Sequence, residues 1–173
     1  REVMLRHWIY RESKQEEAAL LVKHLGLSPV TAQLLANRGQ RTPEEARRFL
    51  RPVLTALQDP LEVPSLRRGS EVLAEAVREG RKITVYGDYD ADGITATVVM
   101  VKCLRCAGAD PNWYVPLRES EGYGLHSDVI RRLAAAGTEV LVTVDCGITA
   151  IEQAQLAREL GVTLIVTDHH EPL

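Results

Sequence analysis

Three aspartates stand at alternate positions of this sequence, at Asp88, Asp90 and Asp92, and Gly93 follows them directly. Carboxylates crowded in this way repel one another and resist ionising together unless a cation lies among them. The spacing matches the first half of an EF-hand calcium loop, but the acidic residue that ends such a loop would fall at Val99. The preceding residues are also β-branched, where an EF-hand requires a helix. We therefore predict a divalent-metal site in a strand-to-helix turn, with an exposed, metal-free acidic turn as the alternative.

Further polar residues follow two later apolar runs that are rich in β-branched residues. Asp145 follows one run directly, and Asp168, His169 and His170 follow the next, at 162–166. If these runs are parallel strands, their carboxyl ends meet in one crevice, which is where ligands bind in such sheets. Aspartates and histidines gathered there can complete a two-metal site, which clamps the attacking and leaving oxygens of a phosphoryl displacement. Imidazole beside carboxylates favours Mn²⁺ over Mg²⁺ or Ca²⁺, which prefer oxygen ligands.

The two adjacent histidines have different predicted roles. Only one of two neighbouring side chains easily faces a given metal ion, and we assign His169 to it. His170 is assigned to the substrate phosphate or to the leaving group. Asp168 is placed with His170 among the candidate catalytic residues.

The sequence around these residues predicts alternating strands and helices, which would hold the candidate side chains in position. Short apolar strands are predicted at 83–86, 112–115, 140–144 and 162–166, and helices at 94–106, 127–136 and 150–160. Continuous β-branched strands separated by helices indicate a parallel sheet that is covered on both faces. With right-handed crossovers, the fold class is α/β with a doubly wound parallel sheet.

A small helical segment precedes this sheet. Helices are predicted at 12–24, at 29–39 after a Ser-Pro cap and from Thr42 with a capping-box glutamate, and a proline-rich connector then leads to a helix at 66–79. We divide the chain into a helical segment with connector, 1–80, and an α/β domain, 81–173. Five arginines form a loose basic cluster in the first segment: Arg38, Arg41, Arg47, Arg48 and Arg51. A solvated helix face explains them better than phosphate contacts, because the same helices also carry Glu44 and Glu45.

Composition and charge narrow the class of protein. The chain has 173 residues and a net charge of −3, with 15 Lys and Arg against 11 Asp and Glu in residues 1–82 and 6 against 13 in residues 83–173. The sequence contains no secretory segment and no apolar run of membrane-spanning length, so we expect a cytoplasmic protein with no membrane partner.

The three cysteines are an odd number, which argues against a disulfide framework. Cys103 and Cys106 lie inside an apolar helix and are assigned a structural role. Cys146 adjoins Asp145 but is interpreted as a small turn residue, because hydrolysis by metal-activated water needs no thiol nucleophile.

Three motifs together resemble those of the DHH phosphoesterase superfamily. They are residues 86–95 (YGDYDADGIT), residues 144–148 (VDCGI) and residues 167–170 (TDHH), the last being the motif that names the superfamily. Within it, the sequence is similar to the RecJ single-stranded-DNA exonucleases, because 37–39 (NRG), 116–118 (PLR) and 121–124 (EGYG) also resemble stretches of that family. Many other relatives begin the first motif with a histidine, and none occurs near Asp88, which disfavours the pyrophosphatase branch.

The resemblance implies a 5′-to-3′ single-stranded-DNA exonuclease of recombination and repair that uses Mn²⁺ or Mg²⁺. It implies that Asp90, Asp92, Asp145 and His169 are metal ligands, that Asp88 supports the site or binds the second ion, and that His170 contacts the scissile phosphate. Single-strand-binding protein and a helicase are the implied partners. Arg118 and Tyr123, in the loop after the second predicted strand, are candidates for contacts with DNA, with ordinary loop packing as an equal alternative.

Two other functions remain open from the sequence. A DHH phosphodiesterase acting on short oligonucleotides or cyclic dinucleotides would share the same metal site. A non-catalytic scaffold is disfavoured, because every ligand expected within this span is present. The fourth motif and the second domain of the family are not found up to Leu173, so we expect this α/β domain to be truncated and, by itself, weakly active or inactive.

Overall fold

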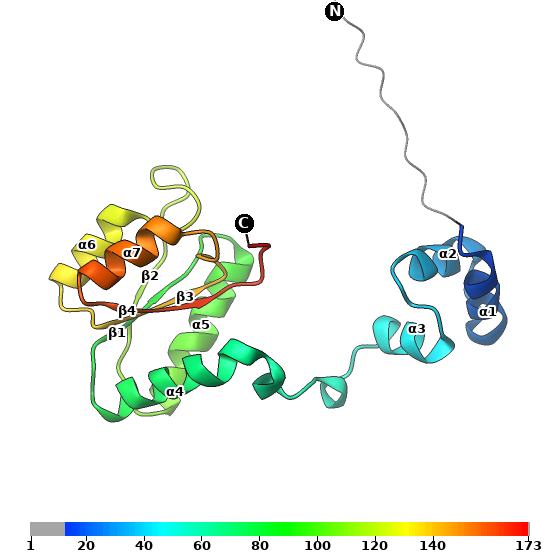
Figure 1. Cartoon of the computed structure of the whole chain (residues 1–173), viewed down its shortest axis with the longest axis horizontal. Coiled ribbons are helices and arrows are strands. Elements are labelled where there is room, and N and C mark those ends of the chain that lie inside the picture. Colours follow the sequence, from blue (N-terminus) through cyan, green and yellow to red (C-terminus); the bar gives the residue numbers. More distant parts are fainter. Residues whose placement is uncertain (1–12, 173) are drawn as a thin grey trace, which may run out of the picture. The chain divides into compact units, whose positions relative to one another are not determined.

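The computed structural model describes residues 13–172, apart from the side chain of Pro64. The chain divides between Asp59 and Pro60 into two compact units. Figure 1 shows the helices of the first unit in blue and cyan, and the sheet of the second in green to red. The predicted helix start at residue 12 lies outside the described residues.

The first unit is built from three helices, α1 (Gln15–Leu25), α2 (Pro29–Asn37) and α3 (Pro43–Leu50). Ser28 caps α2 by accepting a hydrogen bond from the amide of Thr31 at 3.1 Å. Thr42 and Glu45 form the predicted capping box at the start of α3. A core of buried alanines and leucines holds the three helices together: Ala18, Leu21, Ala32, Leu35, Ala36 and Ala46. The connector carries two 3₁₀ turns, η1 (Leu54–Ala56) and η2 (Pro60–Glu62).

The second unit contains a four-stranded sheet. Its strands are β1 (Ile83–Tyr86), β2 (Asn112–Tyr114), β3 (Val140–Val144) and β4 (Thr163–Thr167). All pairs are parallel and the order is β2-β1-β3-β4. The predicted α/β class with a parallel sheet, preceded by helices, is therefore confirmed.

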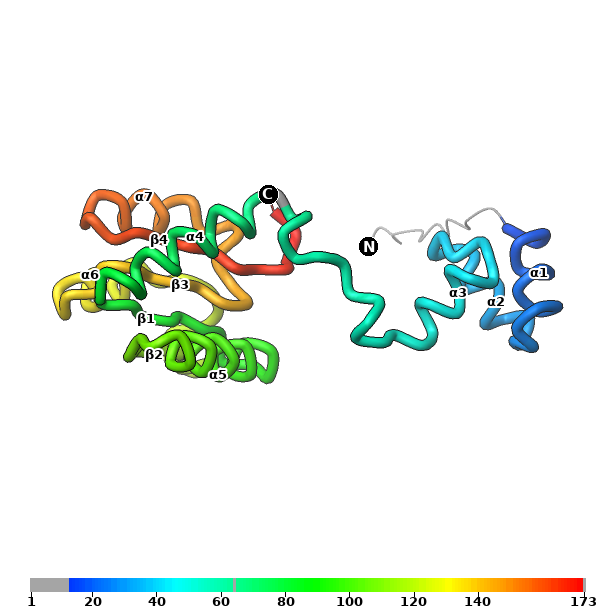
Figure 2. The backbone as a smooth tube through the Cα atoms, turned by 90° about the horizontal axis from the view of Figure 1, so that it is seen from below, coloured from blue at the N-terminus to red at the C-terminus, as the bar shows by residue number. Residues whose placement is uncertain are grey.

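Helices cover both faces of this sheet, as Figures 1 and 2 show. On one face lie α4 (Pro64–Arg78) and α5 (Ala91–Cys106), and on the other lie α6 (Ser127–Ala135) and α7 (Ile151–Glu159). Successive side chains of β1 point into opposite cores: Val85 lies in the α4–α5 core and Tyr86 in the α6–α7 core. Strands β1 and β3 are buried throughout, which is why they are continuous apolar runs, whereas β4 is half-buried and β2 is mostly exposed.

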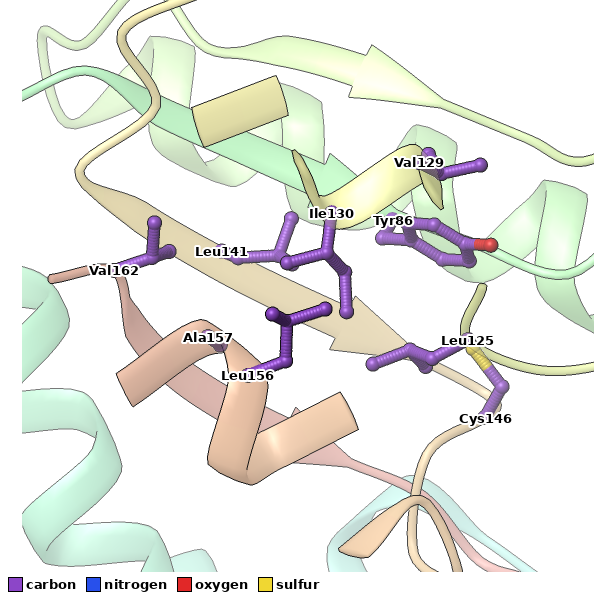
Figure 3. Close-up of a cluster of buried hydrophobic side chains, with 9 residues drawn as sticks. All are labelled: Tyr86, Leu125, Val129, Ile130, Leu141, Cys146, Leu156, Ala157 and Val162. Atoms are coloured by element: carbon purple, nitrogen blue, oxygen red, sulfur yellow. The ribbon is translucent and has the colours of Figure 1, made fainter. Parts of the chain in front are cut away.

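The α6–α7 core is drawn in Figure 3, where Leu141 of β3 lies among side chains from both helices. It includes Leu125, from the loop before α6, and Cys146, from the loop after β3. Two loops of the sheet's carboxyl edge are thus anchored in the hydrophobic core, which limits how far they can move.

Helix α4 belongs to the unit of the sheet. Its Ala76 is buried in the α4–α5 core, and Leu73 and Val77 pack against that core. The division predicted from the sequence places residues 60–80 with the N-terminal helices, because nothing in the local sequence shows which core an amphipathic helix joins. Among the described helices, none has the length and apolar composition needed to cross a bilayer.

Candidate metal centre at the carboxyl edge of the sheet

The predicted crevice lies where the strand order reverses. Strand β1 pairs with β2 on one side and with β3 on the other. The loop after β1 leads to α5 on one face of the sheet, and the loop after β3 leads to α7 on the other face. This is the switch point at which parallel sheets bind ligands.

The loop after β1 is packed directly against the first turn of α5. A Cβ atom on Gly93 would lie 2.6 Å from the Cα of Asp88, and one on Gly87 would collide with the hydroxyl of Thr97. Asp90 caps α5 by accepting a hydrogen bond from the amide of Gly93 at 3.0 Å. The helix predicted from the sequence starts at Ile94, later than the observed start at Ala91. The glycines that flank the aspartates were the available signal for these close contacts.

Two overlapping groups of side chains have ligand atoms close enough for a metal ion. In each group the ligand atoms lie within 4.8 Å of one another. One group contains Asp88, Asp90 and Asp145, and the other contains Asp145, His169 and His170. Asp145 therefore belongs to both, as a carboxylate that bridges two metal ions must.

Asp88 is the most buried of the three aspartates after β1. Its Oδ1 atom is shielded from solvent and has no hydrogen-bond partner in the described part of the chain. Burial raises the pKa of this carboxyl group, and the charges of Asp90 and Asp145 raise it further, against a hydrogen bond from the Tyr89 amide. A buried carboxylate oxygen without a donor, beside two other carboxylates, is the environment that a bound cation stabilises. The donor set therefore fits a divalent metal.

Asp145 has an unusual backbone conformation. Its φ angle is 63°, and no other non-glycine residue of the described chain has a positive value. The amide of Asp145 donates to the carbonyl of Thr167 at 2.9 Å, which ties the β3 loop to the end of β4. Left-handed backbone at an aspartate is strained and clusters at functional sites. Here it places the carboxylate 2.8 Å from Nε2 of His169.

Asp168 has a supporting position rather than a place in either ligand group. Its side chain is fully buried and accepts hydrogen bonds from the amides of Ile148, His169 and His170 at 3.0, 2.8 and 3.1 Å. Burial alone would raise the pKa of Asp168, but these hydrogen bonds and that of the His170 ring hold it below the ordinary value. The carboxylate is thus ionised and shapes the loop that carries both histidines.

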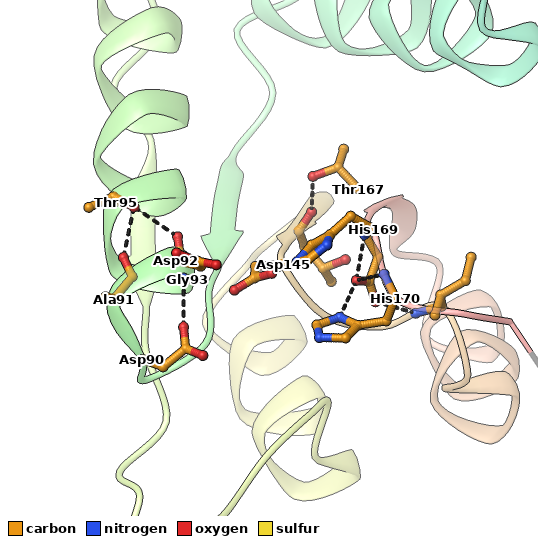
Figure 4. Close-up of polar contacts among 12 residues, drawn as sticks. Asp90, Ala91, Asp92, Gly93, Thr95, Asp145, Thr167, His169 and His170 are labelled. Atoms are coloured by element: carbon orange, nitrogen blue, oxygen red, sulfur yellow. Dashed lines mark hydrogen bonds and ion pairs between the residues drawn. The ribbon is translucent and has the colours of Figure 1, made fainter. Parts of the chain in front are cut away.

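His170 is held by Asp168 on one side and approached by Tyr123 on the other. Its Nδ1 atom lies 2.7 Å from Oδ1 of Asp168 and 3.2 Å from the Tyr123 hydroxyl. The hydrogen bond to Asp168 raises the pKa of His170. The ring centroids of the two histidines lie 4.5 Å apart, and Figure 4 shows both rings near Asp145. His170 is hydrogen-bonded to Asp168, whereas Nε2 of His169 lies 2.8 Å from Oδ1 of Asp145. The two rings thus have different hydrogen-bond partners, although each also offers a nitrogen to the candidate ligand group that they share with Asp145. The separate roles predicted for the two histidines stay predictions.

A pocket of about 440 Å³ opens beside these residues. It is lined by Asp92, Thr95, Ala96, Asp145, Thr167, Asp168 and His169. Asp92 lies in the first turn of α5, exposed, and belongs to neither ligand group, although it faces the pocket that Asp145 and His169 also face. The structure thus brings together all seven residues predicted for the metal and for catalysis.

The two residues predicted to contact DNA lie in the loop between β2 and α6. Tyr123 places its ring edge against His170, with 5.7 Å between ring centroids. The guanidinium of Arg118 lies 5.4 Å from the ring centroid of Tyr89, in the loop that carries Asp88. Both are exposed and border the candidate metal centre.

None of the three cysteines belongs to either group of candidate metal ligands. Cys146 is fully buried in the α6–α7 core, and burial together with nearby carboxylates raises its pKa to about 12, which excludes a thiolate nucleophile at neutral pH. Cys103 and Cys106 are exposed on α5. Neither thiol is part of a core of the sheet unit, and the structural role inferred for this pair stays a prediction.

Comparisons with known proteins agree with this geometry. Residues 82–173 match the model of the DHH family, N-terminal domain. The single-stranded-DNA-specific exonuclease RecJ of Bacillus subtilis is 38% identical over 165 residues, which are 95% of this chain and 21% of that protein. RecJ of Thermus thermophilus is 40% identical over 148 residues, 86% of this chain and 21% of that protein. The chain thus spans about a fifth of the length of these curated relatives.

Solved structures of RecJ have the same fold and were determined with metal ions. A crystal structure of exonuclease RecJ bound to manganese superposes with a TM-score of 0.61 at 38% identity, covering 70% of this chain and 30% of that one. RecJ from Thermus thermophilus in complex with Mn²⁺ gives a TM-score of 0.65 at 32% identity, covering 91% and 22%. Its complex with Mg²⁺ gives 0.53 at 30% identity, covering 90% and 18%.

Proposed function

The chain belongs to the DHH family and is a homologue of the RecJ exonucleases, and from this membership we propose that it supplies part of the catalytic core of a 5′-to-3′ single-stranded-DNA exonuclease. The reaction is hydrolysis of phosphodiester bonds at a two-metal site, in recombination and repair. The observation that carries the proposal is the position of Asp145, which is shared by two groups of ligand atoms.

The proposed ligands follow from the two groups. Asp88, Asp90 and Asp145 would hold one divalent ion, and Asp145 and His169 would hold the other. Asp92, which belongs to neither group but lines the adjoining pocket, would offer a further carboxylate. Mn²⁺ or Mg²⁺, when bound, lowers the pKa of a water ligand and neutralises charge on the phosphoryl oxygens. The mixed carboxylate and imidazole ligands favour Mn²⁺.

His170 is proposed to act on the substrate, and Asp168 to act through His170. Asp168 binds Nδ1 of His170, which leaves Nε2 to face a phosphate oxygen or the leaving oxygen. The raised pKa of His170 favours the protonated ring, which donates to an anion. In this role Asp168 fixes the orientation and charge of His170 without touching the substrate itself.

Arg118 and Tyr123 are proposed to contact the DNA strand. Arg118 is exposed beside the first motif and carries a charge suited to a phosphate, and the Tyr123 ring is half exposed and free to stack on a base. Recruitment by single-strand-binding protein and a helicase, and a cytoplasmic location, complete the proposal.

The test compares degradation of a long 5′-labelled single strand with cleavage of a labelled dinucleotide, with Mn²⁺ supplied. It uses this chain and the same chain extended to the length of its curated relatives. Degradation of the long strand from its 5′ end, by the extended chain at least, is the expected result. Cleavage of the dinucleotide alone would replace the proposal with the small-substrate phosphodiesterase. A Mn²⁺ stoichiometry near zero, measured by calorimetry, would favour the non-catalytic scaffold.

A further inference from the structure

The loop between β2 and α6, residues 115–126, is ordered by a small set of polar contacts outside the metal centre. The carbonyl of Leu117 accepts hydrogen bonds from the amides of Ser120, Glu121 and Gly122 at 3.3, 2.9 and 3.3 Å. The hydroxyl of Tyr86, in β1, donates to the carbonyl of Gly124 at 3.0 Å. The loop is therefore folded on itself and tied to the centre of the sheet.

Glu121 is the side chain on which these contacts converge. Its carboxylate accepts a hydrogen bond from the hydroxyl of Tyr114, at the end of β2, and from the amide of Leu117 at 2.7 Å. It also forms an ion pair with Arg132 of α6 at 3.6 Å. Arg132 in turn donates to the Tyr114 hydroxyl at 3.2 Å, and its guanidinium lies 5.7 Å from the Tyr114 ring centroid. One carboxylate thus links the strand, the loop and the helix.

The same loop carries the two side chains that border the metal centre. Arg118 lies one residue after Leu117 and reaches the ring of Tyr89. Tyr123 lies two residues after Glu121 and reaches His170. Both contacts are made by exposed side chains, which do not hold themselves in place by burial.

We propose that Glu121 is a positioning residue, which braces the loop between Tyr114 and Arg132 and thereby sets Arg118 and Tyr123 at the edge of the metal centre. The consequence for single-strand binding rests on the proposed function, whereas the bracing of the loop does not. We call Glu121 with its partners Tyr114 and Arg132 the loop brace. These three residues lie outside both metal-ligand groups, so their effect on the site is indirect.

Glu121→Gln is the sharpest substitution, because it conserves shape and changes hydrogen bonding. The carboxylate accepts hydrogen bonds from the Tyr114 hydroxyl and the Leu117 amide, and its charge pairs with the Arg132 guanidinium. A glutamine offers one acceptor oxygen and points an NH₂ group at the remaining donors. Glu119→Gln is the matched control, because it makes the same charge change two residues away in the same loop, on an exposed side chain.

The first measurement is amide hydrogen exchange of the chain, followed by mass spectrometry. We expect Glu121→Gln to speed exchange in residues 117–122 by roughly tenfold or more, which corresponds to loss of a hydrogen bond to a charged group. Strand β3 should stay protected, and Glu119→Gln should leave the loop unchanged. Equal exchange in the loop of the two variants would overturn the brace, whatever the outcome for DNA.

The second measurement is equilibrium binding of a labelled single strand. Glu121→Gln should weaken binding several-fold in the native background and cause no further loss when Arg118→Ala and Tyr123→Ala are already present. Full additivity of the effects would mean that Glu121 does not act through these two residues. If neither the native chain nor the extended chain binds a single strand, the proposed function fails, and the NMR signals of the His170 ring replace binding as the readout: a shift in Glu121→Gln but not in Glu119→Gln supports the positioning role of Glu121.

Discussion

Asp88 and Asp145 are both nearly buried carboxylates, yet their surroundings differ. Asp145 has a histidine 2.8 Å away, whereas Oδ1 of Asp88 has no donor within the described structure. Asp88 also faces two other carboxylates. Without a metal ion, burial and repulsion destabilise the charged form of Asp88. A bound cation would remove this destabilisation, so Asp88 is the residue at which metal binding should affect stability most.

Asp88→Asn should have opposite effects with and without metal. In the presence of a chelator we expect the variant to be more stable by on the order of 1 kcal/mol, because the amide removes a repelled charge and supplies a donor. In the presence of Mn²⁺ we expect the native chain to gain stability and the variant to gain much less. Thermal unfolding under both conditions measures the difference. Asp110→Asn, at an exposed position, is the control and should change neither value; a variant that is destabilised in chelator would contradict our account of Asp88.

At the scale of elements, the site depends on how closely the loop after β1 approaches α5. Asp90 ends the loop and caps the helix, and Gly93 lets the first turn pass over the backbone of Asp88. The aspartates are therefore positioned by a helix start rather than by the strand alone.

Gly93→Ala should disrupt this contact. A methyl group would lie 2.6 Å from the Cα of Asp88, so the helix must shift, and we expect a loss of about 2–3 kcal/mol in the free energy of unfolding together with weaker Mn²⁺ binding. Gly69→Ala in α4 is the matched control, because the nearest atom would be Ile165 Cγ2 at 3.7 Å. There the substitution should stabilise the chain by about 0.5–1 kcal/mol through helix propensity. Denaturant unfolding compares the two, and equal effects would show that the close approach is unimportant.

The loop brace should also give acid-dependent stability. The hydrogen bond from Tyr114 lowers the pKa of Glu121 below its ordinary value of 4.5, helped by the Leu117 amide and by the nearby charges of Arg132 and His126. A lowered pKa means that the contribution is present above the unfolded value and is lost as pH falls through the folded value. The melting temperatures of the native chain and Glu121→Gln should therefore differ near neutral pH and converge in acid. A difference that is independent of pH would rule out this carboxylate as the source.

At the scale of the whole molecule, the metal centre belongs to one of two compact units. Every residue of the two ligand groups lies in the unit that begins at Pro60, and three separate loops of the sheet contribute them. A ligand that joins these loops stabilises the sheet unit as a whole.

Mn²⁺ binding should consequently protect one unit and not the other. At about 100 times its dissociation constant, a single bound ion adds roughly 2.7 kcal/mol to the stability of the unit that holds it. We expect slower hydrogen exchange in β1, β3 and β4 when Mn²⁺ is added, and no change in α1, α2 and α3. Chelation should reverse the effect, whereas protection of the N-terminal helices would indicate a metal site elsewhere.

The sequence by itself determined the fold class and the region of the site. The β-branched runs of β1, β3 and β4 favour the strands of a parallel sheet, and polar residues directly after such strands meet at one edge of the sheet. For this reason the seven residues predicted for the metal and for catalysis could be expected to lie close together, as they do in the structure, while their roles stay predictions. The strand and helix limits were less certain, and α5 begins at Ala91 because Asp90 caps it.

Only the tertiary structure decided how these residues differ from one another. Spacing along the chain makes Asp88, Asp90 and Asp92 look equivalent, but burial isolates Asp88, capping engages Asp90, and Asp92 faces the pocket. The left-handed backbone of Asp145 and the support that Asp168 gives to His170 likewise come from contacts between loops far apart in sequence. Charge, burial and hydrogen bonding depend on these distant neighbours, and a local pattern does not contain them.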